Sequence, residues 1–198
     1  MTVRFRPLVA VLVALASSVI LIGVSSASQR AAASAPPATV TATQIPPSRS
    51  PTFLKPGKIV SASDLGVRAF INSNDGVALN QGMSLDGVTY PVATVDGGKT
   101  WRIDGPELHI PAANAPNVVT QVGAGAPATY FAYGGPGGAN SVAVTSDGGK
   151  HWYRAYLGGG IVAAVVDSNR ELYAFTGAAG DYHSTNGGRV WHYSASVF

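Results

Sequence analysis

The sequence predicts an all-β domain, built as a propeller-like array of about three four-stranded blades. Three observations support this prediction. A short loop that ends in tryptophan occurs three times, runs of β-prone residues fill the intervals between the loops, and residues 59–198 contain no long apolar period of 3.6 residues. The first 58 residues differ in composition, so we expect them to lie outside the domain.

The first 27 residues have the composition of an export signal. Arg4 and Arg6 precede an uncharged, mostly apolar run of seventeen residues from Leu8 to Val24, and small residues follow at 25–27, where a signal would be cleaved. A run of this length is also close to the shortest that spans a bilayer, so an uncleaved membrane anchor is the alternative. In either case we expect the remaining chain to be secreted or extracytoplasmic.

Residues 28–58 predict a disordered linker. They contain six prolines among alanine, serine and threonine, with few large apolar side chains. Such a segment cannot bury enough apolar surface to offset the entropy lost on ordering. It is either an extended spacer between the domain and a membrane or wall, or a leader without a spacing role.

The charge of the chain argues against nucleic-acid binding. The whole chain has a formal charge of +3. Residues 59–198, however, hold seven Lys and Arg against ten Asp and Glu, a charge of −3. The folded part therefore lacks the basic surface that binding to a phosphate backbone requires. The chain also has no cysteine, which excludes disulfides and thiolate metal sites.

The three tryptophan-ended loops share one pattern: a hydroxyl residue, then Asp or Asn, two glycines and, at the end, tryptophan. Equivalent positions are 51 and then 39 residues apart. The length of a four-stranded propeller blade is close to these two spacings. The pattern residues are Thr94, Asp96, Gly98, Thr100 and Trp101; Thr145, Asp147, Gly149 and Trp152; and Ser184, Asn186, Gly188 and Trp191.

Each loop predicts a β-hairpin with its own core anchor. Asp-Gly or Asn-Gly between two β-rich runs favours a tight turn, because glycine accepts a positive φ and the short side chain can accept backbone N–H bonds. The hydroxyl two residues earlier can cap the same turn. The tryptophan then begins the returning strand and buries its ring in the core.

These loops resemble the Asp-box, or bacterial neuraminidase repeat, whose form is Ser/Thr-x-Asp-x-Gly-x-Thr-Trp. The second loop departs from that form at His151, and the third departs at Asn186 and Val190. The resemblance extends to sialidases, sortilin-like receptors and photosystem II assembly factors. In those families the boxes join the third and fourth strands of propeller blades, away from the ligand face. The resemblance therefore implies a structural role for the pattern residues.

The intervals between the loops supply the other strands. The segments with strand character are 67–71, 77–79 and 90–94; 117–122, 129–133 and 141–145; and 161–166, 171–175 and 181–184. Closed propellers typically need at least about four blades. The chain therefore either completes a ring with copies of itself, forms an open stack whose end strands are shielded in another way, or collapses into a sandwich or barrel. We favour an open array that can dimerise.

No combination of residues predicts catalysis or metal binding. A sialidase-like glycosidase needs an arginine cluster and a tyrosine with a nearby glutamate, yet Glu107 and Glu171 are the only glutamates of the domain. The domain also lacks the Arg-Ile-Pro signature of those enzymes. Asp104 with Glu107 is the one possible acid pair, although neighbouring acids more often lie in a solvated loop. The four histidines lack ligand spacing, so we expect no metal and no cofactor.

Four tyrosines are the best candidates for a ligand surface, because their rings present an apolar face with a polar tip. They are Tyr130, Tyr133, Tyr153 and Tyr156. Core packing is the competing interpretation. The leading functional hypothesis is an exported, non-catalytic interaction module that binds a protein or a cell-envelope glycan. The alternatives are a degenerate glycoside hydrolase and an assembly or stability factor for a membrane complex.

Overall fold

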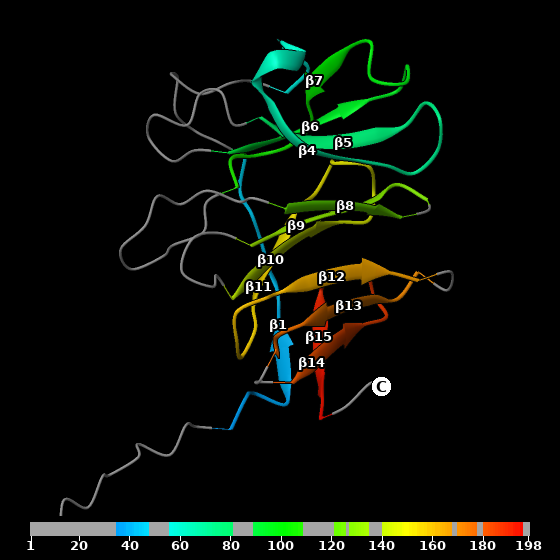
Figure 1. Cartoon of the computed structure of the whole chain (residues 1–198). Coiled ribbons are helices and arrows are strands. Elements are labelled where there is room, and N and C mark those ends of the chain that lie inside the picture. The colour runs from blue at the N-terminus through cyan, green and yellow to red at the C-terminus, as the bar shows by residue number, and fades with distance from the viewer. Residues whose placement is uncertain are drawn as a thin grey trace, which may run out of the picture. The chain divides into compact units, whose positions relative to one another are not determined.

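The computed structural model describes residues 35–47, 56–80, 89–108, 121–125, 127–134, 140–167, 170–177 and 180–195 (Figure 1). These residues form fifteen β-strands and one 3-10 turn, η1 (Ala62–Asp64), with no α-helix among them. The predicted all-β class is therefore confirmed. No described helix could cross a membrane, and the predicted signal or anchor at 1–27 lies outside the described residues.

Twelve strands form three antiparallel units of four, one for each predicted blade. In the first unit they are β4 (Leu65–Phe70), β5 (Gly76–Asn80), β6 (Tyr90–Thr94) and β7 (Trp101–Ile103). In the second they are β8 (Gln121–Gly125), β9 (Thr129–Tyr133), β10 (Ser141–Thr145) and β11 (Tyr153–Tyr156). In the third they are β12 (Ala163–Val166), β13 (Leu172–Phe175), β14 (Asp181–Ser184) and β15 (Val190–Ser194). The three sheets lie one above another as an open, incomplete propeller (Figure 1).

Each sheet has five strands rather than the predicted four. The additional strands come from the N-terminal segment, and we call them the edge strap. They are β1 (Thr39–Thr41), β2 (Thr43–Gln44) and β3 (Ile59–Val60). They pair with β15, β11 and β7 respectively, at the outer edge of each sheet. The prediction of a disordered linker over 28–58 is wrong for residues 39–44, because the free edges of β15 and β11 offer partners that a composition argument does not include.

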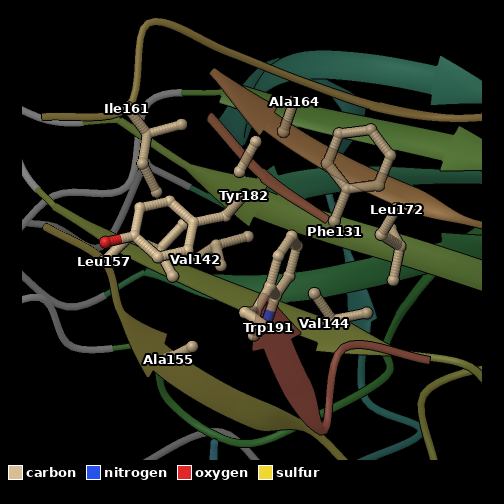
Figure 2. Packing of buried hydrophobic residues seen from close by; sticks show 11 residues of the cluster. Phe131, Val142, Val144, Ala155, Leu157, Ile161, Ala164, Leu172, Tyr182 and Trp191 are labelled. Carbon is tan, nitrogen blue, oxygen red and sulfur yellow. The ribbon is translucent and has the colours of Figure 1, made fainter. Parts of the chain in front are cut away.

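Apolar clusters join the sheets. Between the first and second sheets, Val77 and Leu79 pack with Leu108, Ala143 and Trp152. Between the second and third sheets, a larger cluster surrounds Trp191 and Tyr182 (Figure 2). The members of the second cluster are Phe131, Val142, Val144, Ala155, Leu157, Ile161, Ala164, Leu172, Ala174, Tyr182 and Trp191. Because side chains alternate between the two faces of a strand, each sheet contributes every second residue to these layers.

Candidate functional site

The three predicted loops have the same internal hydrogen bonds. The hydroxyl of Thr94, Thr145 or Ser184 donates to Oδ1 of the Asp or Asn two residues later, at 2.8, 2.8 and 3.0 Å. The same hydroxyl accepts the N–H of the second glycine, at 2.9, 3.0 and 3.0 Å. Both glycines of each loop have φ between +70° and +88°, which other residues rarely adopt.

All three loops use the backbone N–H of the position before tryptophan. The N–H groups of Thr100, His151 and Val190 donate to the Oδ1 of their own loops at 2.9, 3.0 and 2.9 Å. Because this shared bond comes from the backbone, His151 and Val190 can replace threonine and keep it. The tryptophans themselves are at most 1 % exposed. These residues hold a turn and an anchor together.

The second loop differs from the others in the hydrogen bond of its tryptophan. Nε1 of Trp101 and of Trp191 donates to the second glycine of its own loop, at 3.0 and 2.9 Å. Nε1 of Trp152 instead donates to the carbonyl of Asp104 in the first unit, at 3.2 Å. The carboxyl group of Asp104 lies against Gly149, where a Cβ would collide with it. Asp104 therefore sits at the junction between the first and second blades.

A cleft of about 280 Å³ opens beside Asp104 and the first loop. It is lined by Ala93, Thr94, Val95, Asp96, Thr100, Arg102 and Asp104. Burial and the nearby charge of Asp147 raise the pKa of Asp104 to about 7. In contrast, the backbone N–H of Thr100 and the hydroxyl of Thr94 lower the pKa of Asp96 to about 2. The cleft thus places one permanently ionised carboxylate near one that titrates around neutral pH.

Asp104 should make the stability of the domain depend on pH. Its pKa is higher in the folded state than the ordinary value of 3.8, so stability falls as the pH rises from about 4 to about 7. Replacing Asp104 by Asn removes this loss. We expect the variant to match the wild type near pH 4 and to exceed its free energy of unfolding by about 2 kcal/mol at pH 8. Denaturant titrations across this range measure the difference.

Comparing the Asp104→Asn variant with the wild type separates the titration of Asp104 from that of its neighbours. Asp147 and His151 also lie in this region, with His151 Nδ1 2.6 Å from Asp147 Oδ2. Burial would raise the pKa of Asp147, but hydrogen bonds from the backbone and side chain of His151 outweigh it and lower the pKa. Both groups remain in the Asn variant. A stability difference that does not change with pH would contradict the assignment to Asp104.

The four predicted surface tyrosines do not form one surface. Tyr130 is 6 % exposed and belongs to the core between the first and second sheets, so its assignment to a ligand surface is wrong. Tyr133 and Tyr153 lie on the opposite face of the second sheet, Tyr133 against Phe131 and Tyr153 under Arg189. Only Tyr156 is exposed, at 45 %. Alternation along β9 and β11 separates the four rings into two pairs.

The third sheet carries a surface that the sequence reasoning missed. On the face that points away from the second sheet, Val165, Tyr173, His183 and His192 occupy paired positions on four neighbouring strands. We call these four residues the outer stripe. The ring centroids of Tyr173 and His183 are 6.3 Å apart, and those of His183 and His192 are 5.8 Å apart. Val165 is 45 % exposed and His192 is also exposed.

The other end of the stack is more enclosed around its tryptophan, although Phe70 beside it is 45 % exposed. On the outer face of the first sheet, Trp101, Val92 and Tyr90 are at most 2 % exposed. Phe70 packs edge-on against Trp101 with ring centroids 5.9 Å apart, and the Arg68 guanidinium lies 5.8 Å from the Trp101 ring. Both ends therefore expose apolar side chains, and the third sheet differs in its row of tyrosine and histidine rings on neighbouring strands.

We find no recognisable reaction centre among the acids and histidines that the structure describes. The Tyr173 hydroxyl donates to Glu171 at 2.7 Å, on the surface of the third sheet. Glu107, three residues after Asp104, also has an interaction partner. Within the described ranges, no three His, Asp or Glu side chains are grouped so that they could hold a metal ion. His109 lies outside those ranges.

Comparisons with known proteins give structural neighbours only. No family model and no curated protein matches the sequence. Among solved structures, the chain is similar to YCF48 from Cyanidioschyzon merolae, with 21 % identity and a TM-score of 0.41 over 77 % of this chain and 40 % of that one. It is also similar to YCF48 bound to D1 peptide, with 14 % identity and a TM-score of 0.33 over 71 % of this chain and 58 % of that one. The chain thus spans well under two thirds of either neighbour.

Proposed function

We propose that this chain is an exported, non-catalytic interaction module that binds a protein partner and serves the assembly or stability of a larger complex. The observation that carries the proposal is the outer stripe. It lies on the outer face of the last of the three described sheets, which no other described sheet covers.

The chemistry of the outer stripe suits a protein partner. Tyrosine is enriched at the centres of protein interfaces, where its ring buries a large area and its hydroxyl remains able to form a hydrogen bond. Val165 and His192 extend the surface to both sides of the Tyr173 and His183 rings. The four side chains of the stripe stand in one row across the sheet, and the Tyr173 hydroxyl donates to the neighbouring Glu171 carboxylate. A partner can therefore pack a sheet or an extended segment against it.

The test places a photo-crosslinking amino acid at His192 in the full chain, in cells that naturally produce it. The matched control places the same group at Val95, which is 79 % exposed but lies on the first loop. We expect a covalent adduct with a different protein from position 192 and not from position 95. Equal adducts from both positions, or only adducts with a second copy of the chain, would contradict the proposal.

Binding to the partner identified in this way should depend on Tyr173. Replacing Tyr173 by Ala is expected to weaken the affinity at least about tenfold, because a central aromatic side chain typically contributes more than 1 kcal/mol to an interface. Titration calorimetry with purified proteins measures this effect. The Val95→Ala protein serves as the control, and we expect its affinity to equal that of the wild type.

A further inference from the structure

The third loop differs chemically from the other two at one position. It has Asn186 followed by Gly187, where the first two loops have Asp96-Gly97 and Asp147-Gly148. An asparagine side chain can be attacked by the backbone nitrogen of the next residue to form a five-membered ring. The attack is least hindered when that residue is glycine, which has no Cβ. The chain contains no other Asn-Gly pair.

The loop activates the carbon that would be attacked. Oδ1 of Asn186 accepts the hydroxyl of Ser184 at 3.0 Å and the N–H of Val190 at 2.9 Å. When a nucleophile adds to Cγ, negative charge develops on this same oxygen. Two fixed donors that point at it therefore stabilise the tetrahedral intermediate, as the donors of an oxyanion hole do.

The attacking nitrogen is also free in this loop alone. The N–H of Gly97 donates to Asn74 O at 2.9 Å, and the N–H of Gly148 donates to Ala128 O at 2.9 Å. No described residue accepts a hydrogen bond from the N–H of Gly187. The Asn186 side chain is exposed, so water can reach the ring that would form. Electrophile, nucleophile and water are therefore all available at one position.

We propose that Asn186 is a site of intramolecular deamidation, which converts the third loop into an aspartate loop like the other two. The Gly187 nitrogen bonds to Cγ of Asn186, the Cγ–Nδ2 bond breaks, and ammonia leaves with the proton of the Gly187 amide. Water then opens the succinimide. Addition at Cγ gives aspartate with an intact backbone, whereas addition at the backbone carbonyl of residue 186 gives isoaspartate.

The existing loop geometry fits the aspartate product. Asp96 receives the corresponding two donors, the N–H of Thr100 and the hydroxyl of Thr94, and they hold its pKa at about 2. A carboxylate at position 186 would receive the same charge-assisted bonds from Val190 and Ser184. Isoaspartate would lengthen the backbone by one atom before two glycines whose φ values are +73° and +81°. The folded loop therefore favours aspartate over isoaspartate.

The experiment incubates the purified chain at alkaline pH and follows each asparagine by peptide mass spectrometry, as the mass change when –NH₂ is replaced by –OH. Asn72 is the internal control, because it is exposed and its Oδ1 also accepts two N–H groups, at 2.8 Å each, but serine follows it. We expect Asn186 to convert at least tenfold faster than Asn72. We also expect a higher ratio of aspartate to isoaspartate in the folded chain than in the chain unfolded in urea.

One variant keeps the result interpretable. Asn186→Asp, which is the product made directly, should unfold at or above the temperature of the starting protein. The proposal is overturned if Asn186 stays intact in the folded chain while it converts in urea. It is equally overturned if Asn186→Asp unfolds at a lower temperature, because the loop would then not accommodate the product.

Discussion

Replacing Trp152 by alanine should lower the free energy of unfolding by about 3–5 kcal/mol, because it removes a buried indole from the core. The ring is 1 % exposed and lies in the cluster between the first and second sheets. Its Nε1 group also donates to the carbonyl of Asp104 across that junction. The substitution therefore leaves a cavity and an unpaired carbonyl at the contact between two blades.

The matched control is Lys150→Ala, two residues earlier in the same loop. Lys150 is exposed, and we expect its replacement to change the free energy of unfolding by no more than about 0.5 kcal/mol. Denaturant titration followed by circular dichroism measures both variants without depending on the fluorescence of the removed ring. Equal, small effects would show that the indole does not anchor the two sheets.

The strands of the three blades could be predicted from the sequence because local chemistry specifies them. Segments such as 90–94 and 141–145 combine β-branched residues with a following Asp-Gly turn, and both are strands at those bounds. The order of strands then follows from short hairpin connections. Propensity, alternation and turn chemistry agree in these segments, and the fold follows them.

The edge strap could not be predicted, because its order comes from partners distant in the sequence. Val40, Ala42 and Ile45 are separated by threonine and glutamine and flanked by prolines, a composition typical of disorder. In the structure Val40 and Ala42 pack against the cluster between the second and third sheets, and Ile45 packs against the cluster between the first and second. Composition indicates how much apolar surface a segment can bury by itself. The apolar side chains of the strap are instead buried against clusters that other strands form.

The features of the candidate site depend on register and on long-range packing. Tyr173, His183 and His192 are ten and nine residues apart, and they form a row only because the pairing register places Tyr173 opposite His183 and His183 opposite His192. Asp104 stands in an Asp-Gly-Pro sequence that is typical of a solvated turn. Its raised pKa arises from burial beside Gly149 and from the charge of Asp147, both more than forty residues away.

The edge strap should contribute almost as much stability as a core tryptophan. The N–H of Ala42 donates to Arg189 O, and the N–H of Ile45 donates to Trp152 O, each at 2.8 Å. Proline has no N–H, so the double substitution Ala42→Pro and Ile45→Pro removes both bonds and loosens the apolar contacts of the strap. We expect the free energy of unfolding to fall by about 3 kcal/mol. Thermal and denaturant unfolding of the full chain measure this loss.

Thr41→Pro, in β1, is the matched control within the same N-terminal segment. Residues in an antiparallel pair alternate between bonded and non-bonded positions. Because Ala42 and Ala38 are bonded to β15, the N–H of Thr41 points away from that strand, toward the free side of β1. Proline at position 41 therefore removes no bond to β15, and we expect the free energy of unfolding to fall by less than about 1 kcal/mol.

The comparison of the two proteins decides how the strap acts. If both proteins lost the same stability, the strap would act through chain stiffness rather than through its pairing with β15 and β11. A loss confined to the double variant shows that a segment outside the four-strand repeat stabilises the outer edges of the second and third sheets.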